Sequence, residues 1–455
     1  MKYVDRLQKM ILKLEILKNY ISEENSFSGR MKSFLKALRY QKKMKSLRIQ
    51  LPQKASFVNP ILLQSTKYPQ SLLNLQLLFN EKQYQGGSDD KVPGFDLSFF
   101  KKLDTFALQI TDDHFVISRL MDTLPSLSHL QSLAILLPSS FVLPEASPLF
   151  GPHYYNLDSQ AFSNLAHLSI RVPRECMKIT LFERLNLSNL HSFQLSFSLN
   201  SAQKYKEALS NLSKMKHLKT LKLSITYFEQ LEELTKHLFE NIADLELLTS
   251  LRIFLVSPTI TPNYRQKGKI SSDTLPALAK ILQKPIKIQY FSLECRELII
   301  SHQFDKLMEI FSGASGKNFT KFKLGTVPFE LGEGKIELLE RFIEGLENVR
   351  ALKLLCFDLN SDEVLARLTS AIMKLKEIRS ISLGRIGGNK VEEQAFIESL
   401  ARILEKRGLQ SVECEFTDEF NKRIGIFYSP LSFEKISKKN PYFKFVSENL
   451  WPIVK

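Results

Sequence analysis

Three short segments of this 455-residue chain have residue types that could do chemistry. Asp112, Asp113 and His114 together offer ligands that divalent metals accept. Residues 313–317 (GASGK) and 384–390 (GRIGGNK) are glycine-rich, as phosphate-binding loops are. Neither has the GxxxxGK[ST] spacing, and the first connects a predicted helix to a predicted strand, the reverse of the order that aims amides at phosphate. We therefore expect a solvated loop at residues 112–114 and turns at the glycines.

The remaining histidines and cysteines do not form a recognisable site. The eight histidines show no HExxH or similar metal-ligand spacing, and no two of the four cysteines have the CxxC spacing of a zinc or redox site. No GxSxG element or Cys-His signature is present. The sequence predicts a non-enzymatic protein with no catalytic residues, cofactor or metal.

Cysteine usage and hydropathy indicate a cellular location. Four cysteines in a chain of this length argue against a disulfide framework and favour a reducing compartment. The longest apolar stretches, such as residues 133–137, are far shorter than the roughly 20 residues that span a bilayer. We expect no transmembrane segment and a cytoplasmic protein, with a cytoskeletal location or a mitochondrial presequence as alternatives.

Thirteen segments share the pattern apolar-x-x-apolar-x-apolar and recur about every 30 residues. The period of two inside each copy predicts a short strand with alternate side chains on opposite faces. The copies begin at Met44, Leu72, Leu103, Leu130, Leu165, Leu190, Leu218, Leu248, Ile288, Phe319, Val349, Ile378 and Leu409.

Between the copies the apolar period becomes helical. Residues 231–245 place Leu231, Leu234, Leu238 and Ile242 on one helix face. A strand and a helix in about 30 residues form one unit that buries its apolar face by stacking on its neighbours. Similar helices are predicted at residues 205–215, 275–282, 304–311, 336–346, 364–375 and 395–404.

This strand-helix pattern resembles the leucine-rich repeat, in the longer form of ribonuclease inhibitor-like proteins, over roughly residues 44–417. The resemblance implies an α/β solenoid, a curved horseshoe with a parallel sheet on its concave side and helices outside. The chain departs from the family at the Asn/Cys ladder position, where it has Asn80 once and otherwise residues such as Thr111 or Ser198. We therefore expect irregular repeats that lack an asparagine ladder.

The strand alternation also predicts which residues face a partner. If Leu221 and Leu223 point into the core, Lys222 points into the concavity, and a basic, lightly aromatic stretch precedes an acidic end at Glu413 and Glu415. This surface suits an acidic helix or tail of a protein partner, although strand positions can also be polar only for solubility. The candidate partner-binding residues are Lys222, Arg252, Phe254, Tyr290, Lys321, Lys323 and Lys353.

The same register places Cys295, Cys356 and Cys414 at core-facing positions in alternate repeats. Alternate strands lie roughly 10 Å apart, beyond disulfide reach, so these residues are predicted core thiols. Two repeats are expanded, at residues 138–155 and 257–272, and we expect both insertions to be loops that leave the solenoid.

The net charge of +15 is concentrated at the two ends of the chain. Residues 1–54 contain fourteen Lys and Arg against four Asp and Glu, and residues 419–455 contain seven against three, which leaves about +1 for the array between them. Three segments follow: a basic helical N-terminal cap (1–43), the repeat array (44–417) and a basic aromatic C-terminal cap or tail (418–455).

The basic ends either cap the solenoid or dock on an acidic partner. An apolar stripe that includes Val4, Leu7 and Ile11 predicts a helix near the start, and aromatics alternate with lysines in the tail. Docking would involve an acidic protein helix, an acidic cytoskeletal surface or RNA. The candidate residues are Arg6, Lys9, Lys13, Lys435, Lys438 and Lys439.

These observations favour a non-enzymatic protein-binding scaffold or assembly subunit that recognises a partner through the concave face. The alternative is an RNA- or ribonucleoprotein-associated subunit that binds through its basic ends.

Overall fold

The structure is a computed structural model that forms two compact units, unit 1 (Met1–Leu218) and unit 2 (Lys219–Lys455), described separately below. The residues that the structure describes are 9–13, 33–34, 36–41, 43–51, 68–79, 97–109, 127–136, 164–171, 187–199, 209–227, 231–256, 268–284, 287–295, 297–314, 318–359, 361–386, 399, 402–403, 409–416 and 443–447.

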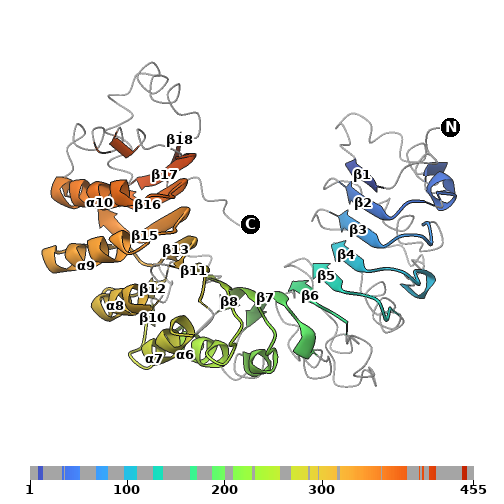
Figure 1. The fold of residues 1–455 in the computed structure, drawn as a ribbon, viewed down its shortest axis with the longest axis horizontal. Helices are drawn as coiled ribbons and strands as arrows, with labels where there is room; N and C mark the ends of the chain where they lie inside the picture. The colour runs from blue at the N-terminus through green and yellow to red at the C-terminus, as the bar shows by residue number, and fades with distance from the viewer. Residues whose placement is uncertain are drawn as a thin grey trace, which may run out of the picture. The chain divides into compact units, whose positions relative to one another are not determined.

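Unit 1 is a stack of parallel strands in sequence order (Figure 1). The described connections contain helical residues at 33–34 and 36–39 and short 3-10 turns at Leu97–Phe99, Leu187–Asn189 and Asn211–Lys214. The strands are β1 Lys9–Lys13, β2 Ser46–Leu51, β3 Asn74–Phe79, β4 Thr105–Gln109, β5 Ser132–Leu136, β6 His167–Arg171 and β7 Ser192–Leu199.

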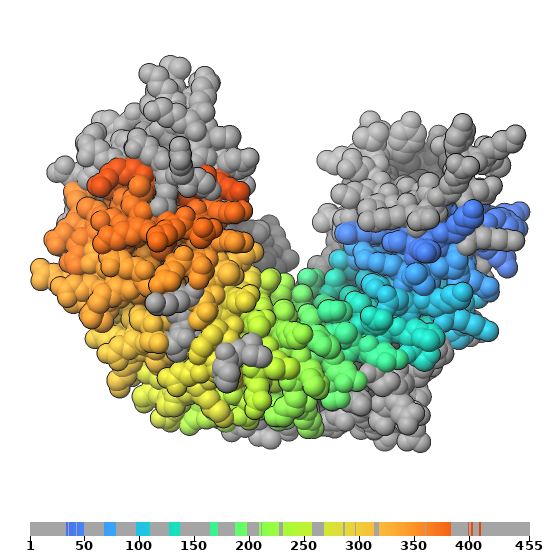
Figure 2. All heavy atoms as spheres, in the orientation of Figure 1, coloured from blue at the N-terminus to red at the C-terminus, as the bar shows by residue number. Residues whose placement is uncertain are grey.

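Unit 2 alternates parallel strands with helices, and its helices cover one face of its sheet (Figure 1). In the space-filling view its repeats follow one another as bands from yellow to orange (Figure 2). The strands are β8 Thr220–Tyr227, β9 Ser250–Val256, β11 Tyr290–Cys295, β13 Lys321–Gly325, β15 Ala351–Leu359, β16 Ser380–Ile386, β17 Ser411–Phe416 and β18 Phe443–Ser447. The helices are α6 Leu231–Ile242, α7 Thr274–Leu282, α8 Phe304–Ala314, α9 Glu333–Glu344 and α10 Asp362–Lys374.

Each of the thirteen predicted strands is present, so the α/β repeat solenoid is confirmed. The predicted helices of residues 231–375 also form, within one to three residues of their expected ends. Of the helix predicted at 205–215, the described part contains the 3-10 turn at Asn211–Lys214, and the helix predicted at 395–404 lies largely outside the described residues.

The core of unit 2 lies between the sheet and the helices. Leu221 and Leu223 of β8 and Leu234 and Leu238 of α6 are at most 1% exposed, as the two periodicities require. A cluster of phenylalanines continues this core under β11 and β13. Phe322 lies at its centre, with its ring centroid 4.9–5.6 Å from those of Phe291, Phe311, Phe319 and Phe342.

Backbone hydrogen bonds link the repeats where a family asparagine ladder is missing. In each link, the carbonyl of the residue just before a strand accepts two amides from the next repeat. The Gln289 carbonyl, for example, accepts the amides of Thr320 and Lys321 at 2.8 and 3.1 Å. We call these links the carbonyl ladder; its acceptors are Lys45, Leu73, Asp104, Gln131 and Ala166 in unit 1 and Lys219, Thr249, Gln289, Thr320 and Arg350 in unit 2.

The prediction of a helix across the first residues was wrong at residues 9–13, which form β1. Met10 and Leu12 share register with the core residues Leu47 and Ile49 of β2. A short apolar run is compatible with either structure, and here the free edge of β2 supplies backbone partners for a strand. At the other end, residues 443–447 of the predicted tail form β18 beside β17, so the sheet extends past both predicted array boundaries.

The second expanded repeat returns to the solenoid instead of ending as a free loop. Residues 268–269 form β10, which pairs with β12 (Leu298–Ile299) in a separate two-stranded sheet. Gly268 is required there, because a Cβ at this position would lie 2.8 Å from Cβ of Leu231. A further short strand, β14 (Phe329–Glu330), pairs with β15. The first insertion, residues 138–155, lies outside the described residues.

Cys295 and Cys356 are buried, as predicted, and form no disulfide with another described residue, while Cys414 occupies the register position beside Leu383 of the core. Burial raises the pKa of the Cys356 thiol, which disfavours the reactive thiolate. Among the described residues, no group of side chains could hold a metal ion, and no helix has the length and apolar character needed to cross a membrane.

We expect both buried thiols to resist alkylation until the repeats unfold. In a variant that carries Cys176→Ser and Cys414→Ser, mass spectrometry after iodoacetamide treatment should find Cys295 and Cys356 unmodified in buffer and modified in urea. Rapid labelling of Cys356 in buffer would contradict the burial that the structure assigns to it.

Candidate functional site

The face of the unit 2 sheet opposite the helices, which we call the open face, carries the predicted partner-binding residues. The strand register arranges them in rows across β8, β9, β11, β13 and β15. One row reads Ser250, Tyr290, Lys321 and Ala351, and the next reads Lys222, Arg252, Ser292, Lys323 and Lys353. Thus the structure brings the sequence-predicted candidates together on five neighbouring strands.

Tyr290 is covered by cations from the strands on both sides. The guanidinium carbon of Arg252 lies 4.0 Å from the centroid of the Tyr290 ring, and Nζ of Lys321 lies 5.6 Å from it. Both distances are within the range of cation–π attraction. This stacking holds two cations on the open face without neutralising them, because neither forms an ion pair with another described residue.

Glu294 is a functional candidate that the sequence reasoning missed. Its Oε2 accepts a hydrogen bond from Nζ of Lys353 at 3.4 Å, and its Oε1 accepts one from Oγ of Ser292 at 3.1 Å. Lys353 reaches across β13 at Gly325, which has no side chain to obstruct the pair. The alternation that placed Tyr290 on the open face also places Glu294 there, so this signal was present in the sequence.

Ion pairing with Glu294 changes the role predicted for Lys353. The side chains of Lys353 and Glu294 are 21% and 23% exposed, so the pair is partly screened from water. Lys353 therefore offers less charge to a partner than Lys222, Arg252 and Lys323, which form no ion pair with another described residue.

Phe254 supplies apolar surface beside these charges. It is 41% exposed and shares register with Ser224 on one side and Glu294 on the other. Its neighbours along β9, Ile253 and Leu255, are at most 2% exposed, so Phe254 points away from a core that is already filled.

The corresponding face of unit 1 has a different character. In β3, β4 and β5 the outward positions carry no charged residue, and they are half-buried. They are Asn74, Gln76, Leu78, Thr105, Ala107, Gln109, Ser132, Ala134 and Leu136. Arg48 of β2 and Arg171 of β6 are charged residues at outward positions of unit 1, but the three neighbouring strands between them lack the charges that gather on the open face of unit 2.

A polar groove of about 650 Å³ follows the starts of the strands in unit 2. The lining residues lie either immediately before a strand or three positions before it. A buried residue, such as Phe319 or Val349, lies between them in the sequence. The lining residues are Thr249, Lys287, Gln289, Asn318, Thr320, Asn348, Arg350 and Glu377. The groove holds no cluster of groups suited to catalysis.

The comparisons with known proteins give likenesses of fold. No family model and no curated protein matches the chain. Among solved structures, the fold is similar to the crystal structure of the Rad7 and Elc1 complex in yeast, with a TM-score of 0.43 and 15% identity over 93% of this chain and 88% of that chain. A likeness this slight carries no argument about function or partners.

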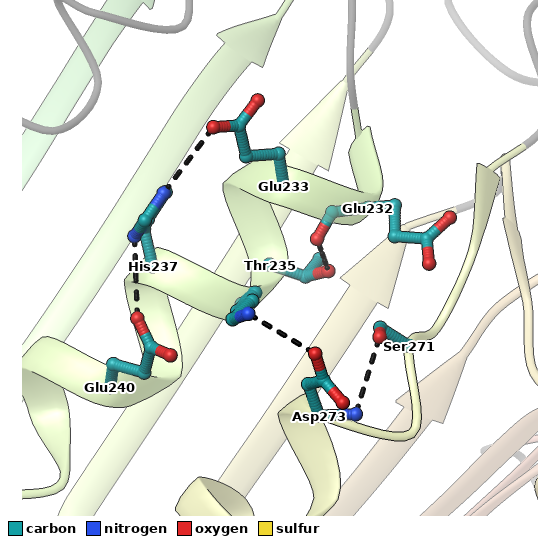
Figure 3. Close-up of polar contacts among 8 residues, drawn as sticks. Glu232, Glu233, Thr235, His237, Glu240, Ser271 and Asp273 are labelled. Atoms are coloured by element: carbon teal, nitrogen blue, oxygen red, sulfur yellow. Dashed lines mark hydrogen bonds and ion pairs between the residues drawn. The ribbon is translucent and has the colours of Figure 1, made fainter.

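The helix side of unit 2 holds polar contacts that stabilise the stack. His237 lies between Glu233 and Glu240 on α6, at 3.4 and 3.3 Å, and Nζ of Lys236 donates to Asp273 before α7 at 3.2 Å (Figure 3). That hydrogen bond raises the pKa of Lys236. Farther along, Arg367 of α10 pairs with Glu340 of α9 in the same way. These contacts join neighbouring helices and form no candidate site.

Of the other candidates, the structure describes only Lys9, Lys13 and residues of the glycine-rich stretches. Lys9 and Lys13 lie at the two ends of β1, and Arg6, Lys435, Lys438 and Lys439 lie outside the described residues. Asp112, Asp113 and His114 also lie outside them. In the first glycine-rich stretch, Gly313 lies in the last turn of α8, before β13, which agrees with the predicted order of helix and then strand. In the second stretch, Gly384 lies within β16.

Proposed function

We propose that this protein is a non-enzymatic, leucine-rich repeat-type scaffold that binds a protein partner through the open face of unit 2. The observation that carries the proposal is the gathering of five cations, a stacked tyrosine and the exposed Phe254 on one preformed sheet surface. A rigid sheet pays little ordering entropy on binding, so charge and shape complementarity translate into affinity.

Two features of the open face favour a protein over a nucleic acid. Tyr290 is already covered by Arg252 at 4.0 Å, which leaves less of its ring for stacking on a base. Glu294 adds a negative charge in the middle of the face, where it would repel a phosphate chain. RNA binding through the basic ends stays the alternative, and we place the scaffold in the cytoplasm, in keeping with its free thiols.

Charge reversal on the open face tests the proposal. Replacing Lys321, Lys323 and Lys353 together by glutamate should weaken capture of the protein partner by about tenfold or more in a quantitative pull-down, because charges that attracted the partner now repel it. Raising the salt concentration should weaken the wild-type interaction in the same direction.

The matched control reverses three cations on the helix side. The Lys306→Glu, Arg341→Glu and Lys376→Glu variant has the same net charge as the open-face variant, and all three of its positions are exposed. Partner capture should be unchanged in this control. Equal losses in the two variants, or no loss in either, would contradict binding at the open face.

A further inference from the structure

We propose that Glu294 determines the specificity of the open face, which selects an acidic protein segment that presents an apolar side chain to Phe254. This inference rests on the proposed function and names the chemistry of the partner. It follows from three observations: the placement of the cations that form no ion pair with another described residue, the position of Glu294 on the strand between them, and the exposure of Phe254.

The cations that form no ion pair with another described residue lie on two sides of β11. Lys222 and Arg252 occupy adjacent positions on β8 and β9, while Lys321 and Lys323 lie on β13. Strands β9 and β13 are separated by two strand spacings, roughly 10 Å. A partner can therefore place one acidic group over each side, at a separation that a short segment of chain spans.

Glu294 lies on β11, the strand between the two cationic sides, one row along from Arg252 and Lys323. It is in register with Phe254 of β9 and Gly325 of β13, and it is bound by Lys353 and Ser292. An acidic partner side chain directed at this point would meet a carboxylate and would have to compete for Lys353. Glu294 therefore repels an acidic partner side chain at this position, and repulsive elements of this kind generate specificity.

Phe254 determines which kind of partner side chain is favoured beside Glu294. Its ring is 41% exposed, lies beside Glu294 in the register, and is two residues along β9 from Arg252. An apolar side chain that packs on this ring would be surrounded by polar contacts, which is the usual arrangement around an interface anchor. The selected segment therefore carries an apolar residue next to its acidic ones.

Fluorescence polarisation with designed peptides tests this preference for an apolar residue next to acidic residues. The probe is a labelled twelve-residue peptide with a central leucine flanked on both sides by aspartates. Wild-type protein should bind it about fivefold or more tightly than a peptide with serine at the centre, since the leucine gains contact with Phe254. The Phe254→Ala variant should lose that preference while still binding both peptides. Equal binding of the leucine and serine peptides to wild type would overturn the anchor.

Glu294→Gln gives the sharper result. It frees Lys353 and removes a repulsive charge, so a third peptide with aspartate at the centre should bind this variant about threefold to tenfold more tightly than wild type. Glu309→Gln on α8, an exposed position with the same change in charge, should leave binding unchanged. A gain of the same size in both variants would show only a general charge effect and overturn the role of Glu294. Thermal melting of each variant confirms that it is folded.

The outcomes separate this inference from the proposed function. If the open-face charge reversal abolishes partner capture but Glu294→Gln and Phe254→Ala leave peptide selection unchanged, the proposed function stands and the inference fails. If peptide selection shifts as expected but partner capture is insensitive to the reversal, the inference stands for acidic peptides and the proposed function fails. Tighter binding of an oligouridylate RNA than of any peptide, insensitive to both variants, would overturn both.

Discussion

Replacing Phe322 by alanine is expected to lower the free energy of unfolding by about 3–5 kcal/mol, the usual cost of removing a buried aromatic ring. Phe322 is fully buried in β13, and its ring packs against those of Phe291, Phe311, Phe319 and Phe342. Those rings come from a strand, a turn and two helices of consecutive repeats, so one substitution leaves a cavity that several repeats share.

Urea unfolding of the full chain, followed by circular dichroism, measures this loss, and hydrogen exchange of peptides from residues 287–359 localises it. Phe254→Ala is the matched control, because it makes the same change at a ring that is 41% exposed on the open face, the opposite side of the sheet. A control that proved as destabilising as Phe322→Ala would contradict the placement of the core on the helix side of the sheet.

Lys284→Met is expected to lower the free energy of unfolding by about 1.5–3 kcal/mol, the range for buried hydrogen bonds to a charged group. Lys284 is 8% exposed, and its Nζ donates to the carbonyls of Leu245 and Ile242 at 2.7 and 3.3 Å. Ile242 ends α6, where carbonyls have no partner within the helix and a cation is favoured by the helix dipole.

Methionine keeps the length and apolar stem of Lys284 but removes the ammonium group, so the change isolates these hydrogen bonds. Lys280→Met serves as the control in the same urea measurement, because Lys280 forms an exposed pair with Asp244, and exposed pairs contribute only about 0–1 kcal/mol. A Lys284→Met protein as stable as wild type would show that the two carbonyls do not need the ammonium group.

Most of the repeat architecture was predictable from the chain because the same strand motif recurs thirteen times, and an apolar pattern of helical period follows many of the copies. Leu221 and Leu223 could belong to a strand anywhere, but thirteen copies at a regular spacing leave a stacked solenoid as the consistent arrangement. The end strands β1 and β18 were not predicted, since pairing with β2 and β17 is a tertiary effect that a local pattern does not contain.

The open face was predictable in its list of residues but not in their interactions. Alternation placed Lys323 and Lys353 on the same row, which the register confirms. It could not show that Lys353 crosses β13 to reach Glu294, because that pair depends on side-chain geometry between strands that are not adjacent. Likewise, stacking of Arg252 on Tyr290 joins diagonal positions rather than register partners.

The carbonyl ladder has a consequence for how freely this chain can change. Because its links join main-chain atoms, they require no particular side chain at the acceptor positions, which already range from Ala166 to Arg350. The hydroxyls of Thr249 and Thr320 add hydrogen bonds to the carbonyls of Lys219 and Gln289. Only proline is barred at the donor positions, since it has no amide hydrogen to give. The acceptor positions Thr249, Gln289, Thr320 and Arg350 also line the polar groove. The side chains that line the groove can therefore be substituted, in evolution or in a designed library, while the main-chain links between the repeats remain.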